Sequence, residues 1–161
     1  MPLQSGSNRI LKLMNRNYTA KEFLELVKEI REKFPDLSLA TDVIIGFPTE
    51  RTKDFNSTLK ILRKIQPDFV NISKFGLHPN TPAKNLKLVN SLMIKKRSKK
   101  VTEFVKRLLL KRNKEWIGWR GEVLIDEKGK NNTFIGRNYA YKPIVISGKN
   151  LLLSLIHISE P

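Results

Sequence analysis

The sequence between residues 19 and 75 alternates between helix and strand patterns, and this alternation constrains the fold more than any other feature. Thr19 and Glu22 have the spacing of a capping box, in which each side chain bonds a free backbone amide at a helix start. Apolar residues then recur at helical spacing until Pro35, which predicts a helix that ends before this proline. Residues 37–45 follow as a strand, and the run Val43-Ile44-Ile45 is apolar on both faces, as in a buried parallel strand.

A second helix and a second strand continue the pattern. Thr52 is the expected N-cap of this helix, and Pro67 is expected to close it. Residues 68–75 then alternate between apolar and polar side chains, as a half-buried strand does. The order helix, strand, helix, strand predicts an α/β fold built from β/α units, whose sheet needs more strands than these two.

Positive charge is concentrated in a long helix pattern over residues 91–115. The chain has 31 Lys+Arg against 15 Asp+Glu, a formal net charge of +16, and residues 84–115 hold 12 of these basic residues against two glutamates. An excess this large favours a polyanionic partner, above all nucleic acid, although a solvated helix whose long side chains cover apolar surface has the same pattern. If the helix follows a phosphate backbone, we expect Lys95, Lys99 and Lys106 to contact it.

Three short strand patterns, at residues 121–129, 133–138 and 141–148, indicate a small all-β module that begins near residue 117. The module interleaves aromatic and basic residues, the combination that stacks bases and holds phosphates, although about half of the aromatic rings must serve the core of so small a module. Its expected RNA contacts are Trp119, Arg120, Arg137, Tyr141 and Lys142. Residues 151–161 show neither basic charge nor strand alternation, and we expect them to be a non-native tail.

The composition excludes several kinds of site. Without cysteine, this chain contains no disulfide, no thiolate nucleophile and no cysteine-ligated zinc or iron–sulfur site. Its two histidines, His78 and His157, cannot form a metal cage by themselves, and no motif of a hydrolase, a phosphate-binding loop or a metalloprotease is present. We therefore expect no metal site and no catalytic residue in this chain. No apolar stretch reaches the roughly 20 residues that span a bilayer, so we expect no membrane partner and a cytoplasmic location.

Two short segments carry groups suited to a ligand. Asp42, Gly46 and Phe47 lie at the strand that ends near residue 45, and the carboxyl ends of strands are where α/β proteins hold ligands. Residues 4–7, Gln-Ser-Gly-Ser, offer amide and hydroxyl groups, and Arg16 could clamp a carboxylate. A tight strand-to-helix turn, an N-terminal cap and an exposed arginine would explain the same residues without any ligand.

Four stretches together resemble the C-terminal part of the radical S-adenosylmethionine tRNA methylthiotransferases. The resemblance is greatest to the archaeal and eukaryotic branch that acts on N6-threonylcarbamoyladenosine. The stretches are PLQSGSNRILKLMNRNYT (2–19), TDVIIGFPTERTKDF (41–55), FVNISKFGLHPNTPAKN (69–85) and WIGWRGEVLIDEKGKNNTFIGRNYAYKPIVI (116–146). They follow one another in the family's order and span most of residues 2–150.

The resemblance implies a domain organisation. Residues 1–115, including the long basic helix 91–115, are similar to the C-terminal portion of the family's partial β/α barrel. Residues 116–150 look like a truncated TRAM domain, a small β-barrel that binds tRNA. In the family, the cysteine triplet of the radical cluster and the amino-terminal methylthiotransferase domain precede the stretches matched here. We therefore expect the chain to be a fragment that is inactive alone.

The resemblance also implies the chemistry of the full-length enzyme. It would be a transferase that adds a methylthio group to C2 of N6-threonylcarbamoyladenosine next to the tRNA anticodon, with the anticodon arm as its partner. Its cofactors would be S-adenosylmethionine, as methyl donor and radical source, and two 4Fe–4S clusters whose ligands this chain lacks, together with a reductant. The expected residues of the S-adenosylmethionine pocket are Gln4, Ser5, Ser7, Arg16, Asp42, Ile45, Gly46 and Phe47.

Other interpretations of the chain remain open. A stand-alone, non-catalytic RNA-binding module would need only the basic charge and the β-module. A complete small α/β ligand-binding protein fits less well, since two or three strands cannot close a barrel and would leave an exposed edge. A cysteine triplet encoded shortly before Met1 would distinguish the methylthiotransferase from the module. Enzymes acting on isopentenyladenosine share most of these motifs, so the modified adenosine also stays open.

Overall fold

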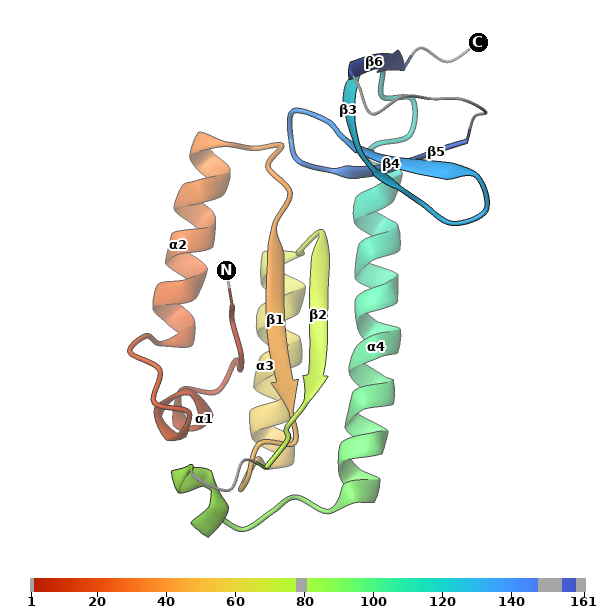
Figure 1. Cartoon of the computed structure of the whole chain (residues 1–161). Helices are drawn as coiled ribbons and strands as arrows, with labels where there is room; N and C mark the ends of the chain where they lie inside the picture. The colour runs from red at the N-terminus through yellow and green to blue at the C-terminus, as the bar shows by residue number, and fades with distance from the viewer. Residues whose placement is uncertain (1, 78–80, 148–154, 159–161) are drawn as a thin grey trace. The chain divides into compact units, whose positions relative to one another are not determined.

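A computed structural model of the chain describes residues 2–77, 81–147 and 155–158, and it divides into two compact units (Figure 1). Unit 1 consists of Met1–Lys33 and Leu39–Glu115, and unit 2 consists of Phe34–Ser38 and Trp116–Pro161. Parallel and antiparallel sheets both occur, which confirms a mixed α/β fold. Among the helices that the structure describes, none has the length and apolar character needed to cross a membrane.

Unit 1 contains a small parallel sheet and the helices that the structure describes. Its elements are α1 (Asn8–Leu13), α2 (Ala20–Lys33), β1 (Ala40–Ile45), α3 (Thr52–Ile65), β2 (Phe69–Lys74), the 3-10 helix η1 (Pro82–Asn85) and α4 (Ser91–Lys114). Strands β1 and β2 pair in parallel, from Ala40 opposite Phe69 to Ile45 opposite Lys74. On the other edge of β1, Gln4 forms an isolated parallel bridge with Val43. The N-terminal segment therefore adds one backbone bridge to the sheet.

The two helix starts predicted from local pattern have different outcomes. At α2 the capping box is confirmed, because the Thr19 amide donates to Glu22 Oε2 at 2.6 Å and the Glu22 amide donates to Thr19 Oγ1 at 3.2 Å. At α3 the prediction that Thr52 caps the helix is wrong, because Thr52 is the first helical residue and Arg51 is the N-cap. The Asp54 carboxylate, one turn into the helix, accepts the Arg51 amide at 2.9 Å instead.

The core of unit 1 lies between the sheet and its helices. In Figure 1, α3 lies behind β1 and β2, and α2 and α4 stand on either side. Its buried hydrophobic residues are Leu3, Ala20, Phe23, Val27, Val43, Ile45, Phe55, Leu59, Ile61, Leu62, Ile65, Val70, Val101 and Val105. Side chains alternate along a strand, so Val43, Ile45 and Val70 face this core. Asp42 and Ile44 of β1, with their register partners Asn71 and Ser73 of β2, face the other way, and we call these four residues the open face.

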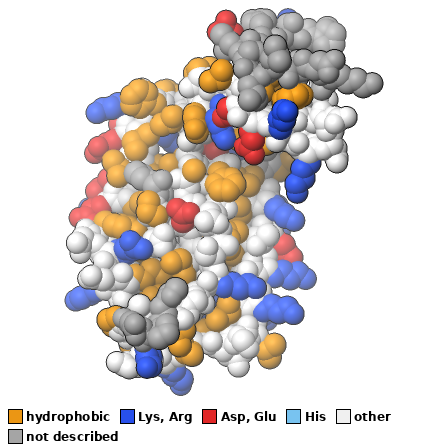
Figure 2. All heavy atoms as spheres, viewed as in Figure 1, with side chains coloured by type: hydrophobic (Ala, Val, Ile, Leu, Met, Phe, Trp, Pro, Cys, Tyr) orange, Lys and Arg blue, Asp and Glu red, His pale blue; other side chains and the backbone are white. Residues whose placement is uncertain are grey.

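Helix α4 is basic along its exposed side and apolar along its buried side. Val101 and Val105 are buried, as the predicted apolar stripe requires, whereas Lys95, Lys99 and Lys106 are exposed. Figure 2 shows Lys and Arg side chains along the edge of unit 1 where α4 lies. The helix begins at the N-cap Asn90, whose side-chain oxygen accepts the Leu92 amide at 2.8 Å.

Unit 2 contains a four-stranded antiparallel sheet in the order β5-β4-β3-β6. The strands are β3 (Gly121–Lys128), β4 (Thr133–Arg137), β5 (Pro143–Ser147) and β6 (Leu155–Ile158). The three strands predicted from the sequence are confirmed. Strand β6, which the sequence pattern did not predict, pairs with β3 and lies in the stretch interpreted as a non-native tail. Residues 151–154 and 159–161 of that stretch are outside the described residues.

Candidate functional site

The turn after β1 depends on a glycine and on a glutamate that folds back onto it. Gly46 has a φ of +80°, and a Cβ atom placed there would lie 2.6 Å from Ile94 Cγ1, so no larger residue fits without displacing Ile94. The Gly46 amide donates to Glu50 Oε2 at 3.2 Å, and the Glu50 amide donates to the Phe47 carbonyl at 2.9 Å. The turn is thereby held as a closed hydrogen-bonded loop at the carboxyl end of the strand.

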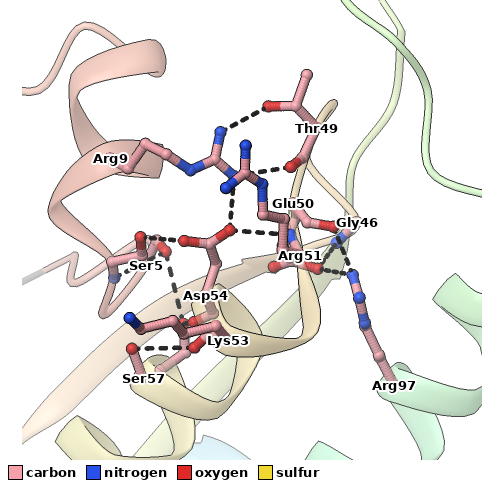
Figure 3. A network of polar contacts seen from close by, with 12 residues as sticks. Ser5, Arg9, Gly46, Thr49, Glu50, Arg51, Lys53, Asp54, Ser57 and Arg97 are labelled. Carbon is pink, nitrogen blue, oxygen red and sulfur yellow. Dashed lines mark hydrogen bonds and ion pairs between the residues drawn. The ribbon is translucent and has the colours of Figure 1, made fainter.

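A buried ion pair ties this turn to α4 (Figure 3). Arg97 Nη1 donates to Glu50 Oε2 at 2.6 Å and to the Glu50 carbonyl at 3.1 Å, and the two side chains are only 7% and 1% exposed. The Arg97 guanidinium also lies over the Phe55 ring. Burial raises the pKa of Glu50, while Arg97 and the Gly46 amide oppose the rise. The pair fixes the position of the turn by two bonds from one guanidinium.

A second polar cluster joins the N-terminal segment to α3. The Asp54 carboxylate accepts Arg9 Nη2 at 2.5 Å, Ser7 Oγ at 2.6 Å and the Arg51 amide at 2.9 Å. Arg9 also donates to Thr49 Oγ1 and to the Thr49 carbonyl, so it spans the turn and the helix (Figure 3). Burial alone would raise the pKa of Asp54, but the hydrogen bonds from Arg9, Ser7 and Arg51 outweigh it, and the pKa lies below its ordinary value.

The N-terminal residues predicted to meet a cofactor use most of their polar groups within the fold. Ser7 Oγ donates to Asp54, and Ser5 Oγ accepts the Ser7 amide at 3.2 Å. The Gly6 amide donates to Thr58 Oγ1 at 2.9 Å. Gln4 is 8% exposed. Its backbone amide donates to the Asp42 carbonyl of β1, and its backbone carbonyl accepts the Ile44 amide. The two serine hydroxyls therefore bond within the segment and to α3, and the backbone of Gln4 bonds to β1.

The predicted residues of β1 divide between the core and the open face. Asp42 lies on the open face and accepts Asn71 Nδ2 at 3.1 Å. The Ile45 side chain is fully buried in the core, and Phe47 packs edge-on against Phe75. A ligand would therefore meet the backbone of Ile45 and Phe47 and not their side chains, although the carbonyls of both residues already accept backbone amides, from Phe75 and Glu50, at 2.9 Å. Arg16 follows the short helix α1, is exposed, and has no side-chain hydrogen bond or ion pair within the described part of the chain.

The structure thus brings together Gln4, Asp42 and Gly46 around β1, and it adds residues that the sequence analysis missed. These are Arg9, Glu50, Asp54 and Arg97. One signal could have found Arg97, because it lies three positions after Ile94 and four before Val101 on an apolar stripe, where a charge requires a buried partner. The identity of that partner has no local signal.

The predicted RNA contacts fall in both units. Lys95, Lys99 and Lys106 lie on the exposed side of α4 in unit 1. In unit 2, Trp119, Arg120, Arg137 and Tyr141 line one pocket of about 630 Å³, together with Glu122, Asp126 and Tyr139 among others. Lys142 does not line it, since this residue is 8% exposed and its ammonium lies 6.0 Å from the centre of the Trp116 ring. Aromatic and charged groups therefore meet in one concave site of unit 2.

Comparisons with known proteins bear on both units. A model of the Radical SAM superfamily matches residues 1–62. A probable threonylcarbamoyladenosine tRNA methylthiotransferase of Archaeoglobus fulgidus is 36% identical over 92% of this chain and 35% of its own length, and one of Pyrococcus abyssi is 40% identical over 91% and 34%. A tRNA-2-methylthio-N(6)-dimethylallyladenosine synthase of Aquifex aeolicus is 39% identical over 97% and 36%. The chain spans about a third of the length of these curated relatives. By these similarities, the chain belongs to the radical S-adenosylmethionine tRNA methylthiotransferase family.

Proposed function

We propose that this chain is part of an enzyme that adds a methylthio group to C2 of N6-threonylcarbamoyladenosine next to the anticodon of tRNA. One observation carries the proposal: the archaeal relatives of that name match 91–92% of the chain, so the similarity runs through both units. Relatives named for dimethylallyladenosine match a comparable share, and that nucleoside is the competing substrate. In this proposal, unit 1 supplies the last β/α units of a partial barrel, and unit 2 is a TRAM-type RNA-binding domain.

The residues of unit 1 suit one wall of a site for S-adenosylmethionine. The open face presents a carboxylate, an amide, a hydroxyl and one apolar side chain, from Asp42, Asn71, Ser73 and Ile44. Ribose hydroxyls and an amino group bond such polar groups, and an adenine ring packs on an apolar side chain. Gln4 bridges to Val43 of β1, and Ser5 and Ser7 follow it in the same segment. Ile45 ends β1, and Gly46 and Phe47 begin the turn after it. Arg16 is proposed to meet the carboxylate of the cofactor.

The iron–sulfur part of the chemistry does not fit the residues of this chain. Thiolates are the usual ligands of 4Fe–4S clusters, and the chain has no cysteine. When bound, such a cluster supplies the electron that splits S-adenosylmethionine. We therefore assign two clusters, and the contact with a reductant, to residues outside these 161. This chain alone is accordingly inactive in our proposal.

The buried pairs of unit 1 hold the wall in position. Glu50 and Arg97 fix the turn that begins at Gly46, and Arg9 and Asp54 fix the segment that carries Ser7. A displacement of about 1 Å in a binding group lowers the rate of an enzyme substantially. These four side chains are therefore positioning residues, which act on the cofactor through the backbone that they hold.

The basic groups of both units support tRNA as the partner. The exposed Lys95, Lys99 and Lys106 of α4 can neutralise phosphates, and the pocket of unit 2 adds aromatic rings and arginines. We propose that they hold the anticodon arm and that the enzyme acts in the cytoplasm.

Nucleoside mass spectrometry of tRNA from a strain that lacks the gene encoding this chain tests the proposal. We expect loss of 2-methylthio-N6-threonylcarbamoyladenosine and accumulation of its unmethylthiolated precursor. Loss of the 2-methylthio derivative of isopentenyladenosine instead would reassign the substrate. Unchanged levels of both 2-methylthio nucleosides would overturn the proposed enzymatic function, and a non-catalytic RNA-binding module would then be the remaining interpretation.

A further inference from the structure

The pocket of unit 2 is large enough for a nucleoside and is bordered by aromatic rings. Its volume of about 630 Å³ falls in the usual range of small-ligand sites, roughly 300–1,000 Å³. Trp119, Tyr139 and Tyr141 line it, and the ring centres of Trp119 and Tyr139 lie 6.5 Å apart. The two tyrosines are 70% and 65% exposed, an unusual amount of aromatic surface to leave in water.

A turn that is bonded from within holds these tyrosines outward. The buried Asn138 side chain accepts the Ala140 amide at 3.1 Å and the Lys142 amide at 3.0 Å. The Tyr141 amide donates to the Asn138 carbonyl at 2.9 Å, and Tyr141 has a φ of +60°, a conformation that costs free energy for a residue with a side chain. The Tyr139 hydroxyl donates to Asp36 at 2.9 Å. The exposed rings are thus fixed in place before any ligand arrives.

The charged groups of the pocket fall into a paired and an unpaired set. Arg137 Nε donates to Asp126 at 2.8 Å, and its guanidinium lies 4.8 Å from the centre of the Tyr141 ring. Arg137 and Asp126 therefore neutralise each other within the lining of the pocket. Arg120 and Glu122 also line the pocket and are exposed. Neither side chain has a hydrogen bond or an ion pair within the described part of the chain. Among the described residues, one strong donor and one strong acceptor of the pocket are therefore left for a ligand.

An unpaired nucleobase complements this set of groups. Every base has a π face that stacks on aromatic rings, and adenine, cytosine and guanine carry an exocyclic amino group that donates to a carboxylate. Uracil carries none, and its single ring N–H lies between two carbonyl oxygens, which a carboxylate repels. We propose that this pocket binds one unpaired nucleobase of an RNA strand and that Glu122 selects against uracil there. The inference rests on the proposed role of unit 2 in RNA binding.

Binding of short single-stranded oligo(A), oligo(C) and oligo(U) to the 161-residue chain at physiological salt, followed by fluorescence anisotropy, tests the selection. We expect oligo(A) and oligo(C) to bind more tightly than oligo(U), and Glu122→Gln to abolish this difference. The matched control is Glu127→Gln, which removes the same charge from an exposed site on β3 outside the pocket. Glu127→Gln is expected to raise the affinities for oligo(A), oligo(C) and oligo(U) by one common factor. Equal responses to Glu122→Gln and Glu127→Gln would overturn the selection.

Stacking is tested separately. Trp116→Phe leaves Trp119 as the single tryptophan, and we expect its emission to be quenched when oligo(A) binds. Tyr141→Ala is expected to weaken binding by about 5- to 150-fold, the range for the loss of one base–aromatic stack, with an unchanged far-UV circular dichroism spectrum. RNA binding that neither quenches Trp119 nor depends on Tyr141 would overturn the pocket and leave the general role of unit 2 intact. Absence of RNA binding would overturn both.

Discussion

Two charged residues at the end of β1 in unit 1 and two in the pocket of unit 2 are arranged in opposite ways. At the end of β1 in unit 1, Glu50 and Arg97 are buried and bonded to each other. In the pocket of unit 2, Arg120 and Glu122 are exposed and have no partner within the described residues. A buried pair that loses one member leaves an uncompensated charge, whereas an exposed charge is solvated with or without a ligand. Substitutions in unit 1 should therefore change stability, and substitutions in the pocket should change binding.

Arg97→Ala is expected to have the largest effect, a loss of roughly 3–5 kcal/mol in the free energy of unfolding of unit 1, because Glu50 stays buried without its partner. All α-helices of the described residues lie in unit 1, and both tryptophans lie in unit 2. Far-UV circular dichroism and tryptophan emission therefore follow the two units separately during urea unfolding. We expect only the circular dichroism transition to move to lower urea.

Two variants control this measurement. Lys96→Ala removes an exposed charge from the neighbouring position and is expected to change the free energy of unfolding by less than about 0.5 kcal/mol. Arg97→Met combined with Glu50→Gln removes both charges and should recover much of the loss. A circular dichroism transition that Arg97→Ala leaves in place would show that the pair does not hold unit 1 together.

The helices and strands could be predicted from the sequence because each rests on neighbouring residues. The capping box at Thr19 is a contact across three positions, and the apolar run before Gly46 is a property of three consecutive residues, 43–45. The partners of Arg97 and Arg9 could not be predicted, because Glu50 is 47 positions away and Asp54 is 45 positions away. Such pairs are chosen by packing, which the local pattern does not contain.

The two other failures have the same origin. Thr52 was expected to cap α3 from its side-chain type, but Asp54 bonds the Arg51 amide while it also binds Arg9 and Ser7. Strand β6 has no alternating pattern of its own and is defined by its pairing with β3. In both cases a contact formed elsewhere in the fold decided the outcome, which a reading of one segment at a time cannot capture.

Gly46→Ala is expected to have the second largest effect, roughly 2–4 kcal/mol. A φ of +80° costs an alanine about 1–2 kcal/mol, and the new Cβ would also displace Ile94. Gly118 in unit 2 has a φ of +79°, and a methyl group added there would meet nothing within 4 Å, so Gly118→Ala should cost the backbone term alone. Urea unfolding of both variants, read by circular dichroism and emission, measures the difference.

The clash can be isolated with a third substitution. In an Ile94→Ala background, Gly46→Ala should cost only about 1–2 kcal/mol, similar to Gly118→Ala, because the atoms that it would meet are gone. A cost of Gly46→Ala that is the same with and without Ile94 would mean that the backbone conformation alone requires the glycine.

Asp54→Asn is expected to cost unit 1 about 1–3 kcal/mol at neutral pH, because it removes the charge from the hydrogen bonds with Arg9 and Ser7. The pKa of Asp54 is lowered in the folded state, so its stabilisation is present above the unfolded value of 3.8 and is lost as pH falls through the folded value. Urea unfolding across acidic pH should show the wild type approaching Asp54→Asn below that value. Glu103→Gln, which removes an exposed charge from α4, is the matched control in the same series.

Arg120→Ala is expected to have the smallest effect on stability, less than about 0.5 kcal/mol, because its exposed guanidinium has no partner within the described residues. Its effect on RNA binding should decide which group it meets. If Arg120 contacts a phosphate, the slope of log K against log salt should become shallower by about 0.7, the value for one single-strand phosphate. If Arg120 contacts a base edge, Arg120→Ala should lower the affinity for RNA and leave the slope of log K against log salt unchanged.

We expect the second of these results, because Arg120 lines the pocket beside Glu122 and Trp119, where a stacked base presents its ring acceptors. Lys128→Ala is the matched control, since it removes an exposed positive charge from the far end of β3, outside the pocket. Removing a lysine that meets only phosphates makes the salt slope shallower without changing the preference among oligonucleotides. If Arg120→Ala behaves as Lys128→Ala does, Arg120 belongs with the lysines of α4 as a phosphate contact, and Glu122 is left as the one charged group in the pocket that selects a base.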